Sequence, residues 1–341
     1  MPEQPEHDPK REKLPTRSQE QPQFGSQEAP TLFLADAEGT TVEGNVEYAV
    51  APTPVETALD KPRGAWAEAW RELRRSPRFY ISAVLLLLFL VMAFFPSWFT
   101  DQDPRFCPIT RTDLRPSSDH WFGTNTQGCD IYSRTIYGAR ASIIVGTATT
   151  GLIVVVGGVV GAIAGYFGGW IDSVLARVTD IFFGIPLLLA ALVFMSAFTE
   201  RTVWTVVAAL GLFGWMQVAR IMRGSVITVK SSDYVVAARA LGGGTGRILT
   251  RHVLPNAIAP VIVVATISLG TFIATEATLS FLGIGLPLTE VSWGADISTA
   301  TNVLRDAPYQ LFFPSLFLSV TVLSFILLGD AVRDALDPKL R

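Results

Sequence analysis

The chain has 341 residues, of which 49% are hydrophobic and 17% are charged, with a formal net charge of −3. Soluble domains carry about a quarter charged residues, and the apolar residues here are gathered into long blocks, so an ordinary soluble globular protein is excluded. Residues 1–62 have a net charge of −7 and the remainder +4, a positive charge too small and too scattered to indicate nucleic-acid binding.

Residues 1–62 contain nine prolines and many polar residues, with few large apolar side chains. Such a segment buries too little surface to offset its chain entropy, which predicts a disordered cytoplasmic tail. A variable tail and a regulatory or docking segment are both compatible with this composition. Residues 63–78 follow as a predicted interfacial helix, because Trp66, Trp70 and Leu73 share one helical face. Its basic residues are typical of an anchor at an anionic membrane surface: Lys61, Arg63, Arg71, Arg74, Arg75 and Arg78.

Six apolar stretches predict an all-α, multi-pass membrane protein with six transmembrane helices. The first stretch is 79–95, within a segment that runs to residue 99, and the others are 141–167, 181–199, 202–219, 253–275 with a continuation towards 281, and 307–329. A loop over 100–140 separates the first span from a core over 141–333, and residues 334–341 form the C-terminus.

The basic residues near the span ends predict the orientation. Six Lys or Arg fall in 61–78, and six fall in 220–252 against one acid. The loop 100–140 has five basic and five acidic residues, and 276–306 is net acidic. Both termini are therefore predicted to be cytoplasmic and the loop 100–140 to be external. The absence of a recognisable cleavable signal is consistent with this, since the first apolar run starts near residue 79.

Two features suggest tight packing and a cross-link. Glycines recur every fourth residue at 157, 161, 165 and 169, which leaves a bare helical stripe for another backbone, although chance in a glycine-rich span is the alternative. Cys107 and Cys129 both fall in the predicted external loop, where thiols tend to pair. A disulfide pinning the loop near span two is one interpretation, and two free thiols are the other. No metal-ligand pattern accompanies them.

Catalytic and cofactor chemistry is not indicated. The run GGGTGR at 242–247 lacks the lysine and preceding strand of a phosphate loop. The three histidines lie in three separate regions, so no catalytic or metal cluster is expected. Glu276, near the outer end of span five, is the clearest ionisable residue inside a span. It either contacts substrate as part of a cavity or gate, or it is a satisfied packing acid.

Residues 231–256 predict a helix–glycine–helix segment on the cytoplasmic side. Ser231 to Asp233 are capping residues, and 234–241 is compatible with a helix. Gly242 to Gly244 end that helix, and residues 247–253 form a second short one. Pro255 is expected to open span five in its first turn.

This segment resembles the cytoplasmic coupling motif of the permease subunits of bacterial ABC importers. The motif is carried by Ala237, Ala238, Gly242, Leu254 and Pro255, with Arg239 and Asn256 in the same segment. Val236 stands where the family usually has a glutamate. Residues 121–146 further resemble the approach to span two of the second permease of dipeptide and oligopeptide importers, although Cys129 stands where that family has a basic residue. Further matches occur at Arg177, Asp180 and Pro186, at 276–283, at 292–294 and at 329–338.

The resemblance covers about residues 75–341 and implies a type I importer permease in the bacterial cytoplasmic membrane. It implies a heterodimer with a second permease, two ATPase subunits that bind ATP and magnesium, and an external binding protein that delivers peptide. Nickel, glutathione or another small solute is the alternative cargo. A stand-alone channel or ion-driven carrier would leave the coupling segment unexplained, and an intramembrane enzyme would need a catalytic constellation that the sequence does not indicate.

Overall fold

The computed structural model describes residues 65–287 and 289–336. The predicted tail over 1–62 and the last five residues lie outside this range. Within it, every regular element is a helix, apart from one isolated bridge between Thr124 and Asp130. The all-α prediction is confirmed for the described residues.

Four helices are long and apolar enough to cross a membrane, namely α2 (Pro77–Phe94), α3 (Ile131–Phe167), α11 (Ala259–Phe281) and α13 (Tyr309–Leu336). They fall at four of the predicted spans. Helix α3 begins ten residues before the predicted start at 141, because Arg134 and Arg140 lie inside the helix and interrupt the uncharged run. Its first turn is capped by Asp130, whose side chain accepts from the N–H of Ser133.

The other two predicted spans are not single helices. The stretch 181–199 is divided between α4 (Gly169–Phe183) and α5 (Leu187–Ser196), which meet at 78°. Gly184 ends α4, and Pro186 disfavours a helical conformation at Ile185, so this stretch is not one continuous helix; the two helices make one span only as a bent pair. The stretch 202–219 is likewise divided between α6 (Val203–Gly214) and α7 (Met216–Lys230), which meet at 45°.

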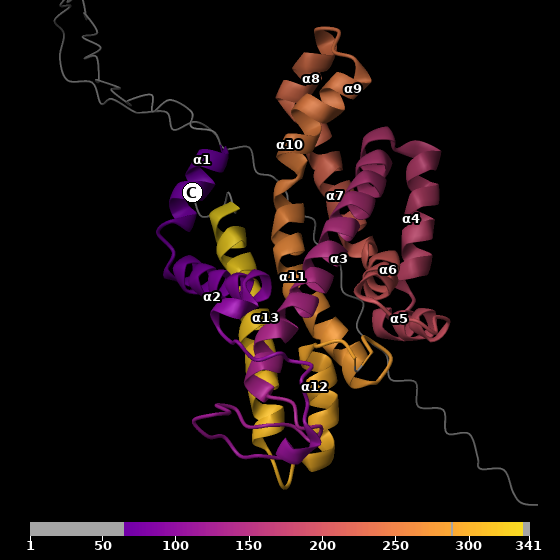
Figure 1. Cartoon of the computed structure of the whole chain (residues 1–341). Helices are drawn as coiled ribbons and strands as arrows, with labels where there is room; N and C mark the ends of the chain where they lie inside the picture. The colour runs from indigo at the N-terminus through magenta and orange to yellow at the C-terminus, as the bar shows by residue number, and fades with distance from the viewer. Residues whose placement is uncertain (1–64, 288, 337–341) are drawn as a thin grey trace, which may run out of the picture. The chain divides into compact units, whose positions relative to one another are not determined.

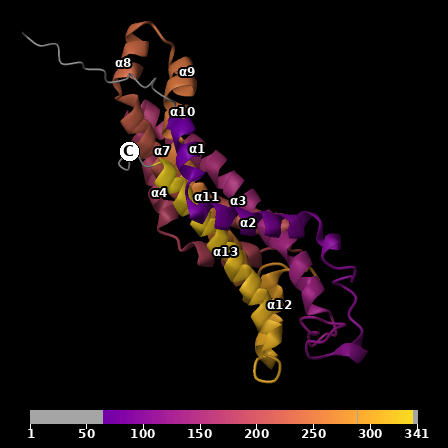
Figure 2. The same cartoon turned by 90° about the vertical axis from the view of Figure 1, so that its left-hand side faces the viewer.

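The remaining helical elements are short: α1 (Ala65–Leu73), η1 (Pro96–Trp98), η2 (Ile109–Arg111), α8 (Asp233–Ala240), α9 (Thr245–Ile248), the π-helix η3 (Leu249–Val253), α10 (Leu254–Ala257), α12 (Trp293–Ala300) and η4 (Thr301–Val303). Helix α3 runs through the centre and packs against α2, α6, α7 and α11 (Figure 1). Helix α13 packs against α2 and α11. In both views α1 and the end of α13 lie on the side of α8 and α9, opposite α12 (Figures 1 and 2).

The predicted interfacial helix over 63–78 corresponds to α1 and the start of α2. It is interrupted at Ser76, which is extended because Pro77 follows it. Trp70 is half exposed, and the Arg74 guanidinium lies 4.8 Å from its ring centroid. Helix α1 packs on α13, and Arg78 pairs with Asp334 at 3.5 Å. The N-terminal helix α1 and the start of α2 therefore lie beside the C-terminal end of α13.

The glycine stripe of α3 lies against α7. A Cβ at Gly157 would lie 2.5 Å from the carbonyl oxygen of Trp215, and one at Gly165 would lie 2.7 Å from that of Arg223. Gly161 faces the carbonyl of Ala219 in the same way. Gly169 does not take part, because it lies beyond the end of α3 with nothing within 4 Å of a Cβ. The predicted close packing is thus confirmed for three of the four glycines, and within the chain.

We expect Gly161→Ala to lower stability although alanine favours helices. A Cβ there would meet Ala219 and lie 2.9 Å from the Cβ of Met222, so α3 and α7 must separate at a cost of about 1–3 kcal/mol. Gly158→Ala is the matched control on the same helix, because nothing lies within 4 Å of its Cβ. The control should be neutral or stabilising by up to about 1 kcal/mol. Thermal unfolding in detergent measures both, and equal midpoints would contradict the packing argument.

Candidate functional site

Residues 231–256 form a hairpin that extends beyond the neighbouring ends of α3 and α4 (Figures 1 and 2). We call this segment the coupling hairpin. Its outgoing limb is α8, which begins after the extended Ser232, where the sequence predicts it, although the Ser232 side chain makes no capping hydrogen bond. Its returning limb is α9, the π-helix and α10, which lead back to α11.

Gly242 ends α8 in a left-handed conformation with φ +83°. The N–H of Gly242 donates to the carbonyl of Arg239, and that of Gly243 donates to the carbonyl of Ala238, each at 3.0 Å. These two bonds satisfy carbonyls that the helix end would leave unpaired, and together they form a Schellman cap. The predicted stop at Gly242 is confirmed, and its cause is the left-handed backbone that glycine adopts without strain.

The returning limb is less regular than predicted. Pro255 has no N–H to donate to the carbonyl of Arg251, and its ring crowds that carbonyl, which accounts for the widened π-helical turn before it. The side chain of Asn256 donates to the carbonyl of His252 at 2.8 Å. Pro255 opens α10 and not the span itself, because α11 begins at Ala259 with a second proline in its first turn.

The hairpin is fixed to the helices below it. Three of its apolar side chains are buried in the core: Val235, Ile248 and Val253. The Tyr166 hydroxyl, at the end of α3, donates to the carbonyl of Thr245 at 3.4 Å, and Lys230 donates to the carbonyl of Tyr166 at 2.5 Å. On the returning limb, Ser225 of α7 donates to the carbonyl of Ala257 at 2.8 Å. The hairpin is therefore hydrogen-bonded to α3 and α7, and its returning limb leads directly into α11.

The structure separates the predicted coupling residues into two groups. Ala237, Ala238, Arg239 and Gly242 lie together on α8 and its cap, and all except the half-buried Ala238 are exposed. Leu254, Pro255 and Asn256 lie in α10, at the base of the returning limb. Two further apolar side chains are exposed, Val236 at 53% and Leu241 at 89%. The tip of the hairpin therefore offers small and apolar groups together with two exposed arginines, Arg239 and Arg247.

A second feature is a cavity of about 360 Å³ at the bends of the two broken helix pairs. Its walls come from the α4–α5 turn, the α6–α7 break and one face of α11. Aromatic side chains form much of the wall, with three polar ones: Phe183, Phe213, Phe272, Gln217, Ser268 and Thr271. None of the residues that line it is charged. The sequence did not single out these polar residues, since they are uncharged, lie within apolar stretches and form no recognisable motif.

Glu276 does not line this cavity. Its side chain is fully buried between α3 and α11, and it accepts hydrogen bonds from the hydroxyls of Ser142 at 2.9 Å and Ser280 at 2.8 Å. The same Ser280 oxygen accepts from the N–H of Leu286 at 3.1 Å. Both carboxyl oxygens are thus occupied by packing contacts, which supports the packing interpretation of this acid over a cavity or gate role.

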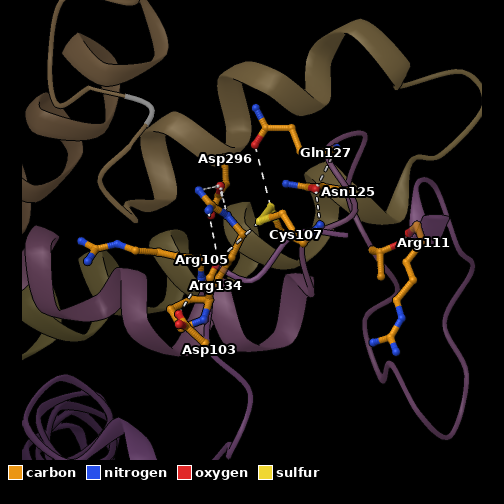
Figure 3. Close-up of a disulfide and its surroundings, with 11 residues drawn as sticks. Asp103, Arg105, Cys107, Arg111, Asn125, Gln127, Arg134 and Asp296 are labelled. Atoms are coloured by element: carbon orange, nitrogen blue, oxygen red, sulfur yellow. Dashed lines mark hydrogen bonds and ion pairs between the residues drawn. A yellow bond between two sulfur atoms is a disulfide. The ribbon is translucent and has the colours of Figure 1, made fainter. Parts of the chain in front are cut away.

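In the structure Cys107 and Cys129 are joined by a disulfide (Figure 3). Cys129 is fully buried, two residues before the start of α3, and its N–H donates to the side-chain oxygen of Asn125 at 2.9 Å. The bond holds the 22-residue excursion of the loop against the start of α3. It thus lies where the sequence places a pinned external loop.

Loss of this cross-link should destabilise the protein. For the Cys107→Ser, Cys129→Ser double variant, chain entropy alone predicts a loss of about 3 kcal/mol, because the reduced loop gains freedom in the unfolded state. The measurement is thermal unfolding in detergent, with the wild type under reducing conditions as the control. Non-reducing peptide mapping checks that the disulfide is formed in the wild type. Two alkylatable thiols would show that it is not.

The family profile described as "Binding-protein-dependent transport system inner membrane component" matches residues 157–341. The chain belongs to this family. A second profile, "N-terminal TM domain of oligopeptide transport permease C", matches residues 64–116 of the permease. The resemblance seen in the coupling hairpin therefore extends over most of the chain, and the permease is of the second, C-type kind within the dipeptide and oligopeptide group.

Curated relatives of the permease agree. The oligopeptide transport system permease protein OppC of Bacillus subtilis (strain 168) is 38% identical over 281 residues, which cover 82% of this chain and 92% of that protein. The dipeptide transport system permease protein DppC of the same organism is 37% identical, covering 80% and 86%. The glutathione transport system permease protein GsiD of Pectobacterium atrosepticum is 35% identical, covering 82% and 93%. These relatives are transport components and not enzymes, and so is this permease.

A solved chain described as "Crystal structure of an amino acid ABC transporter with histidines" aligns with 18% identity and a TM-score of 0.43. The alignment covers 58% of the permease and 91% of that chain.

One buried ion pair of the permease was not found from the sequence. The Arg134 guanidinium donates to the Asp296 carboxylate at 2.7 Å, joining the start of α3 to α12, close to the disulfide (Figure 3). Each side chain is at most 10% exposed. Burial raises the pKa of the Asp296 carboxyl, and the charge of Arg134 opposes that rise. The available signal was an arginine in an otherwise apolar approach to a span, but 162 residues separate the partners.

Proposed function

We propose that this permease is one of two membrane subunits of an ATP-driven importer for dipeptides or oligopeptides. Identities of 37–38% to an oligopeptide and a dipeptide permease, each over at least 80% of the chain, carry this proposal. Glutathione, itself a tripeptide, is the second candidate cargo, because a glutathione permease is 35% identical over a similar length.

In this proposal the chain crosses the bacterial cytoplasmic membrane six times, with each bent helix pair counted as one span. The side that carries the coupling hairpin is cytoplasmic, because the basic residues concentrate there. The hairpin docks on one of two ATPase subunits, which bind ATP and magnesium and perform the hydrolysis. A second permease supplies the other half of the pathway, and an external binding protein delivers the peptide.

The contacts of the coupling hairpin support a mechanical role. ATP-driven closure of the ATPases would move α8, and the bonds from Tyr166 and Ser225 would pass that movement to α3 and α7. Because α6–α7 and α4–α5 are broken at the cavity, a shift of these helices changes its shape. The cavity would then open alternately to the two sides of the membrane.

Affinity purification of the permease in mild detergent, with its partners identified by mass spectrometry, tests the assembly. The expected result is recovery of two ATPase subunits and a second, different permease. Reconstitution of that complex with its binding protein should then give peptide uptake that requires ATP. Uptake by the permease alone, without any ATPase, would instead establish a channel or ion-driven carrier.

A further inference from the structure

A second hollow adjoins the cavity at the helix breaks. This groove has a volume of about 440 Å³ and is lined by α7, α11 and the end of α13. The cavity and the groove share Val264 and Ile267 of α11. They therefore adjoin along a single helix, and the groove leads towards the end of the molecule where α13 ends, on the side of the coupling hairpin (Figure 1).

Helical spacing shows that one stripe of α11 runs through both linings. Pro260, Val264, Ile267 and Thr271 are separated by four, three and four residues, so they share one face. Helix α7 contributes in the same way, with Gln217 in the cavity and Ile221 in the groove. At 1.5 Å per residue the stripe is about 16 Å long, which matches an extended peptide of about five residues.

The polar groups in this lining are suited to a peptide backbone. Gln217 is exposed, and its amide can both donate and accept; Ser268 contributes a hydroxyl. Neither side chain has a hydrogen-bond partner among the described residues. Apart from Arg333, which lies at the far end of the groove, no residue lining the cavity or the groove is charged. A wall of this kind binds amide groups without selecting the charge of substrate side chains, and the terminal arginine attracts the carboxylate that peptides carry.

We propose that the peptide travels along this stripe of α11, with Gln217 and Ser268 as the polar contacts to its backbone and Arg333 at the inner mouth. The proposal rests on the proposed import function and adds the route through this subunit and the residues that the substrate touches. The shared wall of the two hollows favours a substrate route over a lipid site, because a lipid groove has no need to adjoin the uncharged cavity at the helix breaks.

The permease suits a thiol-accessibility test, because its only two cysteines are paired in the structure. Ser268→Cys and Gln217→Cys would place one free thiol on each wall of the route. Val155→Cys is the control, since Val155 is 64% exposed on α3 and lies outside both linings. Each variant is assembled with its ATPases and second permease in inside-out vesicles and treated with a charged, membrane-impermeant thiol reagent.

We expect the reagent to modify Ser268→Cys and Gln217→Cys but not Val155→Cys. A transported peptide at ten times its Kd should slow both reactions about tenfold, since about one site in eleven remains free. Two results would overturn the route: modification that peptide does not slow, or reaction only with a lipid-soluble maleimide, which would mean that lipid or the second permease fills the groove. Peptide uptake by the wild-type complex in the same vesicles separates this failure from failure of the import function itself.

Discussion

Gly242→Pro should abolish ATP-driven uptake while leaving the normal amount of permease in the membrane. Proline fixes φ near −65°, whereas Gly242 has φ +83°, and it also removes the N–H that donates to Arg239. The cap at the end of α8 cannot form, so the hairpin loses the shape that would fit the ATPase. The spans do not include this residue, so insertion should be unaffected. Uptake of labelled peptide and immunoblotting of membranes are the two measurements.

Gly242→Asn is the matched control, because asparagine tolerates the left-handed region better than other residues that carry a side chain. The asparagine keeps the backbone N–H, and its side chain has room because nothing lies within 4 Å of a Cβ at this position. We expect most of the uptake to survive. Uptake by Gly242→Val should lie between that of the Pro and Asn variants, since a β-carbon in the left-handed conformation costs about 1–2 kcal/mol. Normal uptake by Gly242→Pro would refute the coupling role of the hairpin tip.

Asp296→Asn should be the most destabilising conservative substitution among those considered. It leaves the buried Arg134 charge without its carboxylate, and breaking a buried pair typically costs about 3–5 kcal/mol. Arg105→Gln is the control, because Arg105 and Glu290 form a pair at 3.3 Å with side chains 63% and 46% exposed. Loss of such an exposed pair costs about 0–1 kcal/mol. The thermal midpoint of the purified permease reports both effects.

A second variant separates charge burial from packing. Arg134→Met combined with Asp296→Val removes both charges and changes the total side-chain volume little. It should recover much of the stability lost in Asp296→Asn, because no uncompensated charge remains. If the double variant is as unstable as the single one, the shape of the site and not its electrostatics determines the loss.

The sequence was sufficient for features that depend on local chemistry. Uncharged length located α2, α11 and α13, and the glycine run correctly ended α8. The sequence did not predict where helices extend beyond the uncharged stretches or where they break within them. Arg134 tolerates a place inside α3 because Asp296 neutralises it there, and no local pattern announces that partner. Gly184 and Pro186 are residues that commonly end helices. The hydropathy of the stretch stays high on both sides of them, however, so it predicts a single span.

The same limit applies to the candidate site. The candidate coupling residues fall within one short segment, whereas the cavity is assembled from the α4–α5 turn, the α6–α7 break and α11 and has no sequence motif of its own. Gln217 and Ser268 become candidate substrate contacts only because the fold places both in the wall of one cavity. For Glu276 the sequence left a gate and a packing acid both open. The choice depends on its partners Ser142 and Ser280, of which Ser142 lies 134 residues away on another helix.

The length of α3 has a mechanical consequence. Its 37 residues at 1.5 Å each make a rod about 55 Å long, against a hydrocarbon layer of about 30 Å. One end begins beside the disulfide and the other bears Tyr166 against the coupling hairpin. A rod of this length that tilts about its middle by about 10° moves its two ends by about 5 Å in opposite directions. In the proposed coupling, a displacement at the hairpin end of α3 would therefore move the disulfide end by a similar distance.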